Sequence, residues 1–220
     1  MIKYNSSFSI AVDGGSASGK TTGSKFIAKK FNFKLLSSGK LYRYLAFRIL
    51  KNKGNYNYSF VKKVSKNITL KKLNTNQLYD TKVTKLSSII AKKKYIRVSL
   101  KKFQLNFLKK NKRVIIEGRD ITSKIIPNAD LKIFFKCSLK EKAKRRFKEF
   151  KKKNKKTTLK EVEKAIKLRD FSDKNRKESP LLFVKGAVLV DTTNLSIKQM
   201  EAKLTKLLNK VIKNNNYGNL

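Results

Sequence analysis

The stretch "GGSASGKTT" (residues 14–22) follows the apolar run "SFSIAV" (7–12) and fits the pattern G-x-x-x-x-G-K-T. Glycines in such a turn allow backbone angles that direct several N–H groups toward one anion. Apolar residues at Phe26, Ile27 and Phe31 predict an amphipathic helix directly after the turn, whose free N–H groups point at the same anion. A strand before the turn and a helix after it predict a P-loop that binds the phosphates of a nucleoside triphosphate.

The P-loop pattern assigns a continuous set of residues to nucleotide binding: Gly14, Gly15, Ser16, Ala17, Ser18, Gly19, Lys20, Thr21 and Thr22. We expect Lys20 to reach the β- and γ-phosphates, and the Thr21 hydroxyl to ligate Mg²⁺ through the bound nucleotide. The motif alone does not distinguish a GTPase, an ATPase motor and a small kinase. The "DKN" at 173–175 does not fit the guanine-reading Asn-Lys-x-Asp, and a motor usually needs a longer chain. A kinase for a small acceptor is therefore favoured.

Five short apolar runs predict the strands of the fold, at 7–12, 33–37, 113–118, 131–136 and 187–191. They show little polar alternation, which is typical of strands that are covered on both faces in a parallel sheet. Helical patterns lie between them, and capping-box pairs mark three helix starts: Ser138 with Glu141, Thr158 with Glu161, and Ser196 with Gln199. This alternation predicts an α/β chain with the three-layer P-loop NTPase fold around a five-stranded parallel sheet.

The chain has 56 Lys and Arg against 14 Asp and Glu, which gives a formal net charge of +42. Such a surface attracts polyanions, so a basic nucleic-acid-binding protein that only binds ATP is one alternative. The cations are mostly lysines scattered through every segment, and Lys and Asn share A-rich codons, so the composition also fits an AT-rich genome. The sequence lacks aromatic stacking motifs of the RNA-recognition type, and we expect no specific nucleic-acid partner.

Further features bear on the cellular location. No apolar run approaches the roughly 20 residues that a membrane span needs, and the N-terminus lacks the pattern of a secretory signal. The single cysteine, Cys137, rules out a disulfide within these residues and ends an apolar run, so we expect it to be buried. We therefore expect a cytoplasmic protein without membrane contact.

A kinase for a small acceptor requires arginines that hold the acceptor's phosphate. Arginine is rare in this chain, so its positions carry information. Three groups stand out: Ser38 with Arg43 after the second predicted strand, Arg119 with Asp120 after the third, and Arg169, Asp173 and Arg176 at spacings that share one helix face. Because ligands bind at the carboxyl ends of the strands in an open α/β sheet, we expect the first two groups beside the P-loop.

In their order, "IAVDGGSASGKTT", "SSGKLYR", "EGRDI" before "PNADLKIFF", and "RD-x-x-D-x-N-R" resemble the motifs of the bacterial cytidylate kinases. The likeness runs from the first predicted strand to about residue 208 and leaves out 53–80. It implies transfer of the γ-phosphoryl group of ATP to CMP or dCMP, with Mg²⁺ as the metal. Such small kinases are often monomers, so we expect a monomer. The closest alternative is another small-acceptor P-loop kinase that acts on a different nucleoside monophosphate or metabolite.

The resemblance also implies the roles of individual residues. Lys20, Arg119 and Arg169 would be catalytic. Substrate binding would involve Arg43, Arg119 and Arg169 at the acceptor phosphate, Ser88, Arg97 and Asp120 at the cytosine edge, Asp173 and Arg176 at the sugar and phosphate, and Ser38. Arg145 and Arg146 would belong to a lid over ATP. A carboxylate, a hydroxyl and a guanidinium can match the amine donor and two acceptors of cytosine.

The same resemblance divides the single kinase domain (1–220) into a core at about 1–52, 95–142 and 178–212, an NMP-binding insertion at about 53–94, a lid at about 143–177 and a loose tail at 213–220. The polar composition of 53–92 and of "KKKNKKTT" (151–158) predicts surface insertions or mobile loops. Three residues depart from the family pattern: Ser37 replaces a usual Asp, Gly15 a usual Pro, and Tyr79 a common Arg. The chain is also shorter than many relatives in 53–80.

Overall fold

Five parallel strands form the central sheet of the computed structural model, which describes residues 7–152 and 156–214. They are β1 (Phe8–Gly14), β2 (Lys34–Ser37), β3 (Arg113–Gly118), β4 (Leu131–Lys136) and β5 (Val188–Asp191). Their order in the sheet is β2-β3-β1-β4-β5, and every neighbouring pair is parallel. All five predicted strands are confirmed, with bounds that shift by about one or two residues at the most.

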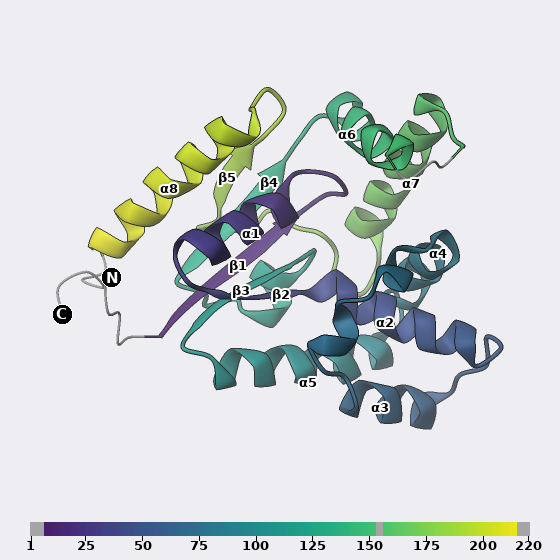
Figure 1. The fold of residues 1–220 in the computed structure, drawn as a ribbon. Coiled ribbons are helices and arrows are strands. Elements are labelled where there is room, and N and C mark those ends of the chain that lie inside the picture. Colours follow the sequence, from purple (N-terminus) through teal and green to yellow (C-terminus); the bar gives the residue numbers. More distant parts are fainter. Residues whose placement is uncertain (1–6, 153–155, 215–220) are drawn as a thin grey trace.

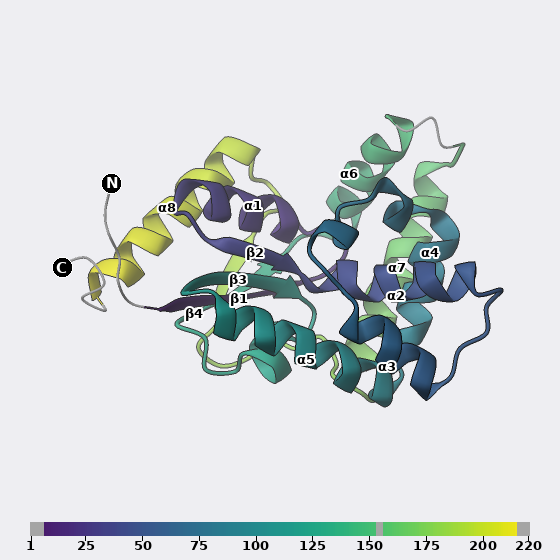
Figure 2. The same cartoon turned by 60° about the horizontal axis from the view of Figure 1, so that its bottom comes forward.

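Separate apolar clusters cover the two faces of the sheet. Side chains of β1 alternate between them: Ile10 and Val12 join the cluster that includes residues of α1 (Lys20–Lys30) and α8 (Ile197–Asn214), and Ala11 joins the other. Figures 1 and 2 show α1 and α8 over one face and α5 (Lys94–Lys110) over the opposite face. This arrangement confirms the predicted three-layer α/β fold.

The remaining helices are α2 (Ser38–Lys51), α3 (Tyr58–Lys66), α4 (Thr81–Ile90), α6 (Leu139–Lys151) and α7 (Leu159–Asn175). Short 3₁₀ turns span Lys71–Leu73 and Asn76–Tyr79, and a π-helical turn spans Ile121–Ile125. The helices α6 and α7 pack against each other beyond the carboxyl edge of the sheet (Figure 1). They cover most of the segment that the sequence predicts to be a lid.

The predicted capping boxes begin the expected helices, though one of them is incomplete. The pairs before α7 and α8 each exchange two hydrogen bonds. Before α6, Ser138 Oγ accepts from the backbone N–H of Glu141, but the Glu141 carboxylate accepts from Arg145 Nε. An ion pair along the helix therefore takes the place of the second capping bond.

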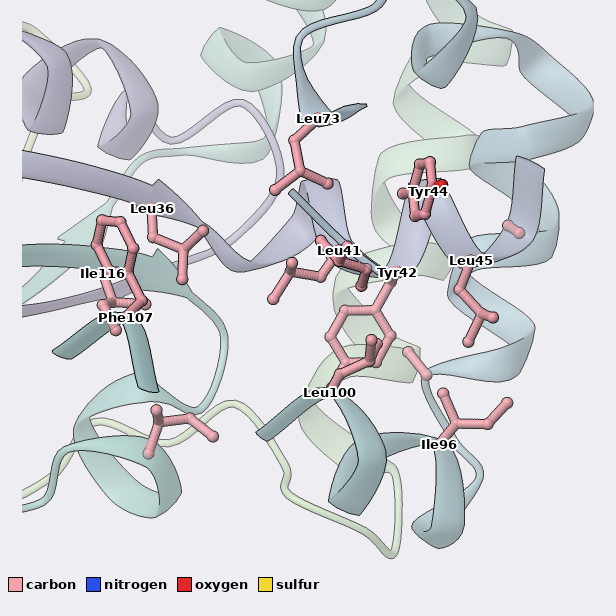
Figure 3. Packing of buried hydrophobic residues seen from close by; sticks show 14 of the residues in the cluster. Leu36, Leu41, Tyr42, Tyr44, Leu45, Leu73, Ile96, Leu100, Phe107 and Ile116 are labelled. Carbon is pink, nitrogen blue, oxygen red and sulfur yellow. The ribbon is translucent and has the colours of Figure 1, made fainter. Parts of the chain in front are cut away.

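The segment 53–92, predicted to be a surface insertion or a mobile loop, is not a loop, because it is largely helical and packs into the core. Its helices α3 and α4 begin with side-chain caps from Asn57 and Asp80, which compensate for a weak apolar pattern. Several of its apolar residues pack inward: Leu78 and Ile90 are fully buried, and Leu73 joins the cluster around α2 and α5 (Figure 3). Residues far apart in sequence thus share one core.

The structure describes only part of the second segment predicted to be an insertion or a loop, residues 151–158. The helix α6 ends at Lys151, and residues 153–155 lie outside the described residues, as do residues 215–220 of the expected loose tail. Cys137 is buried, as expected. Within 7–152 and 156–214, no helix combines the length and apolarity that crossing a membrane requires.

Two adjacent isoleucines of α4 test whether this segment belongs to the core. Ile90 is 0% exposed and Ile89 is 49% exposed. We expect Ile90→Ala to lower the free energy of unfolding by about 2–5 kcal/mol, because it leaves a cavity. The matched Ile89→Ala should cost less than about 1 kcal/mol. Urea unfolding followed by circular dichroism measures both, and equal losses would contradict the packing of α4 described above.

Candidate active site

A cavity of about 970 Å³ opens at the carboxyl ends of the strands. The P-loop after β1, the ends of β2 and β3, and side chains of α6 and α7 line it. Every site residue that the sequence predicts lines this cavity, apart from Gly14 and Gly15. The groups expected from separate strands therefore do converge, at the edge where open α/β sheets bind ligands.

Close packing explains both glycines that lie outside the cavity lining. A Cβ added to Gly14 would lie 2.5 Å from the carbonyl oxygen of Phe135 on β4, and one added to Gly15 would lie 2.8 Å from Asp170 Oδ2 on α7. Further along the loop, Ala17 (φ 54°) and Gly19 (φ 89°) adopt left-handed backbone angles. These angles turn the chain into α1, whose first N–H groups have no partner within the helix and can bind an anion.

Lys20 begins α1 and is buried among other cations. Its Nζ donates to the carbonyl oxygen of Gly15 at 2.9 Å. Burial, followed by the positive charge of Arg119 and a smaller effect of Arg169, lowers the pKa of Lys20 to about 7, although the Glu117 carboxylate acts in the opposite direction. A bound polyphosphate would favour the charged ammonium, because it adds negative charge at short range.

Glu117 is a site residue that the sequence analysis missed. It is the next-to-last residue of β3, is 2% exposed, and accepts from Thr21 Oγ1 at 2.9 and 2.8 Å through its two carboxylate oxygens. The signal was present in the sequence, since a carboxylate inside the apolar run "RVIIEG" needs a partner. Hydroxyl and carboxylate oxygens at the start of α1 fit the hard oxygen ligands that Mg²⁺ prefers.

Arg119 connects the P-loop to α7. Its Nε donates to Asp173 Oδ2 at 2.8 Å, and its Nη2 donates to Ser16 Oγ at 3.3 Å. Arg176 lies on the other side of Asp173, with Nη1 3.5 Å from Oδ1. Burial raises the pKa of Asp173, but the charges of Arg119, Arg169 and Arg176 outweigh it and leave that pKa below its ordinary value. One carboxylate thus stays ionised among three guanidinium groups.

Several of these guanidinium groups retain unused donors. Among the described residues, the Nε atoms of Arg43, Arg97 and Arg169 and the Nη2 of Arg176 are buried without a hydrogen-bond partner. Burial, followed by the charge of Arg119, lowers the pKa of Arg169 to about 10, and burial also lowers the pKa of Arg43. Buried donors that repel one another fit a multiply charged anion such as a phosphate group.

Asp13 was also missed by the sequence analysis, and it holds the turn that carries Arg119 and Asp120. It is 0% exposed and accepts from the N–H of Ile121 at 3.0 Å, and from the N–H and Oγ1 of Thr122 at 2.8 and 2.7 Å. Burial raises the pKa of Asp13, although these hydrogen bonds counteract it. A carboxylate at the end of β1 therefore fixes the backbone that follows β3.

The far end of the cavity contains the residues expected at a cytosine edge. Arg97 and Asp120 form a buried ion pair, and Arg97 Nη1 also donates to the carbonyl oxygen of Ala91 at 2.9 Å. The Arg97 guanidinium lies over the Tyr42 ring, 5.4 Å from its centroid. The Ser88 hydroxyl donates to the carbonyl oxygen of Thr84 at 3.3 Å and lines the same cavity.

Other predicted residues lie around the rim of the cavity. Arg145 on α6 donates to Thr192 Oγ1 and to the Thr192 carbonyl oxygen, at 3.0 and 2.6 Å, and Thr192 Oγ1 bonds the carbonyl oxygen of Ser18 in the P-loop. Arg146 pairs with Glu149 at the surface. Thr192, which follows β5, was not predicted, because only the folded chain places it beside the P-loop.

The departures from the family pattern have local consequences. Tyr79 places its ring under the Arg43 guanidinium, with the centroid 4.9 Å from Arg43 Cζ. Ser37 ends β2, and its side chain does not cap the start of α2. Next to it, the buried Ser38 hydroxyl accepts from Gln104 Nε2 at 2.8 Å.

The fold and the site together define a P-loop protein in which a phosphate-binding loop faces a second cluster of anion-binding arginines. Comparisons with known sequences assign the family: the sequence model described as "Cytidylate kinase" matches residues 10–210. The chain belongs to the cytidylate kinase family.

Individual relatives agree with this assignment. The cytidylate kinase of Fusobacterium nucleatum subsp. nucleatum is 37% identical over 217 residues, which cover 92% of this chain and 97% of the relative. That of Mycoplasmoides gallisepticum is 36% identical over 215 residues, with 94% and 96% covered. An uncharacterized protein from Eubacterium ventriosum shares the fold, with a TM-score of 0.54 at 14% identity over 92% of this chain and 98% of that one.

The lowered pKa of Lys20 predicts that nucleotide affinity depends on pH. As the pH rises above 7, a growing fraction of the amine in the free protein is neutral, so binding a polyphosphate takes up protons. We expect the affinity for ADP to fall by up to about tenfold per unit between pH 7.5 and 9.5, a range in which the phosphates stay ionised. Calorimetry in two buffers of different ionisation enthalpy measures the uptake. Lys20→Met should abolish it, and a wild-type protein without proton uptake would contradict the assignment.

Proposed function

We propose that this protein transfers the γ-phosphoryl group of ATP to the 5′-phosphate of CMP or dCMP, giving ADP and CDP or dCDP. The observation that carries the proposal is one cavity in which a P-loop faces arginines with unused buried donors, with Arg97 and Asp120 beyond them. Membership of the cytidylate kinase family supports this choice of acceptor.

The chemical task is to bring two anionic phosphates within bonding distance. Each pair of unit charges at 4 Å repels by about 4 kcal/mol at an effective dielectric constant near 20. Lys20, Arg119 and Arg169 would reduce this repulsion, since all three line the cavity and the charge of Arg119 contributes to the lowered pKa of both Lys20 and Arg169. The acceptor phosphate is already ionised near pH 7, so no general base is needed. Positioning and charge stabilisation would therefore supply the catalysis.

Thr21 and Glu117 are the residues that would hold Mg²⁺, as their oxygens meet at the start of α1. In the described part of the chain, no three His, Cys, Asp or Glu side chains cluster as a metal site. The nucleotide's phosphates would therefore supply further ligands. Held by these residues, Mg²⁺ would neutralise negative charge that develops on the phosphates during transfer.

Base recognition would use the buried pair of Arg97 and Asp120 together with Ser88. The Asp120 carboxylate can accept from the exocyclic amine of cytosine, and the guanidinium and hydroxyl can donate to its two acceptors. A base without that amine would leave Asp120 without this partner, which penalises other acceptors. On the remaining sides, Asp173 and Arg176 would contact the sugar and phosphate, and Arg145 and Arg146 would cover ATP and exclude water.

An acceptor panel tests the proposed function directly. CMP, dCMP, UMP, AMP, shikimate and dephospho-coenzyme A are each supplied with ATP and Mg²⁺, and ADP release is measured. We expect CMP or dCMP to exceed every other acceptor by at least about tenfold in kcat/KM. Lys20→Ala should abolish turnover while the protein stays folded. Turnover with a different acceptor would replace the proposal, and RNA binding without any acceptor-stimulated turnover would favour a nucleic-acid-binding role.

Substituting Asp120 tests base reading separately from ATP binding. Asp120→Asn keeps the size of the side chain and an acceptor for Arg97, but removes the carboxylate charge. We expect kcat/KM for CMP to fall by about 10–100-fold, while the Kd for ATP changes less than about threefold. Steady-state kinetics and calorimetry measure the two effects. Losses of the same size for both nucleotides would remove Asp120 from the base-reading role.

A further inference from the structure

Ser16 of the P-loop is held from two directions. Its backbone N–H donates to Asp170 Oδ1 at 2.9 Å, and its Oγ accepts from Arg119 Nη2 at 3.3 Å. Arg119 Nε in turn donates to Asp173 Oδ2 at 2.8 Å, and Asp173 lies one turn after Asp170 on α7. The hydrogen bonds among Ser16, Asp170, Arg119 and Asp173 therefore join the P-loop, the turn after β3 and the helix α7 in one network.

Asp170 is only 9% exposed. None of the nucleotide contacts proposed above uses this buried carboxylate, so it has another role. Its second oxygen, Oδ2, accepts from Lys142 Nζ on α6 at 2.6 Å. The carboxylate thus ties both α6 and α7 to the P-loop. Charge-assisted hydrogen bonds of this kind are short and strong, which makes Asp170 a firm link between these elements.

Gly15 provides an independent sign of this link. A Cβ at Gly15 would lie 2.8 Å from Asp170 Oδ2 and 3.2 Å from Oδ1. Gly15 is not one of the glycines with positive φ, so its backbone angles do not explain the missing side chain. In this structure the Asp170 carboxylate approaches Gly15 so closely that an added Cβ would crowd it.

We propose that Asp170 is a positioning residue that couples ATP binding at the P-loop to acceptor binding at Arg119 and Arg169. The proposal rests on the proposed function. Arg169 and Asp173 lie beside Asp170 on α7 and line the cavity, so an acceptor phosphate that shifts α7 also shifts Ser16 through Asp170. The reverse path moves α7 when ATP orders the P-loop. Each nucleotide therefore binds more tightly when the other is present, and the two effects are reciprocal.

The test compares Asp170→Ala with Glu163→Ala, which removes a carboxylate two turns earlier on the same helix. Calorimetry measures the Kd of CMP without and with a non-hydrolysable ATP analogue and Mg²⁺. We expect the analogue to tighten CMP binding at least about fivefold in the wild type and in Glu163→Ala. In Asp170→Ala we expect the analogue to tighten CMP binding by less than about twofold. The Kd for CMP alone should be unchanged, and kcat should be at least about tenfold lower.

A second variant keeps the test informative if Asp170→Ala does not fold. Gly15→Ala keeps the Asp170 carboxylate but crowds it, and should weaken the coupling by itself. If Asp170→Ala folds, Gly15→Ala should add little in that background. Coupling that persists in every single variant that folds, or that is absent from the wild type, overturns the inference. A wild-type protein that does not phosphorylate CMP or dCMP contradicts the proposed function instead, so the two failures can be told apart.

Discussion

Mutual repulsion among buried cations is the constraint on which the site depends. Lys20, Arg43, Arg119 and Arg169 share one cavity. Burial, followed by the charge of Arg119, lowers the pKa of Lys20 to about 7 and that of Arg169 to about 10. Asp173 offsets part of this repulsion, since it stays ionised between Arg119 and Arg176. The cavity of the free protein therefore carries excess buried positive charge, which an anionic ligand would neutralise.

The scaffold supports this arrangement by fixing backbone with carboxylates placed behind the site. Asp13 holds the turn after β3, and Asp170 holds Ser16 while Lys142 holds Asp170. Each of these acids is buried and bonded to backbone N–H groups, so the cost of its desolvation is offset locally. Asp13 and Asp170 are outside the cavity lining and hold the backbone of segments whose neighbouring residues line it. Within the lining itself, Asp120 pairs with Arg97 and Asp173 pairs with Arg119.

Most of the fold and much of the candidate site could be predicted, because their signals are local. A strand, a glycine-rich turn and a helix follow one another in 7–31, and four of the arginines that line the cavity come soon after strands or share one helix face: Arg43, Arg119, Arg169 and Arg176. The helical segment 53–92 was missed because its apolar residues are few, and only the packing of Leu78 and Ile90 against distant helices reveals their role. Glu117 and Thr192 were missed for a related reason, as their partners Thr21 and Ser18 are remote in sequence.

Two departures from the family pattern affect how the charged side chains of the site are held. An arginine at the position of Tyr79 would add another cation beside Arg43, whereas the tyrosine ring offers Arg43 a favourable face without adding charge. At Gly15, the absence of a side chain admits the Asp170 carboxylate, which a Cβ at that position would crowd. Both residues therefore favour the same outcome, a cavity whose cations are held in place before an anionic ligand arrives. Few of the lysines that dominate the net charge of +42 line the cavity: among the described residues, Lys20, Lys25, Lys40 and Lys148 do so beside the arginines.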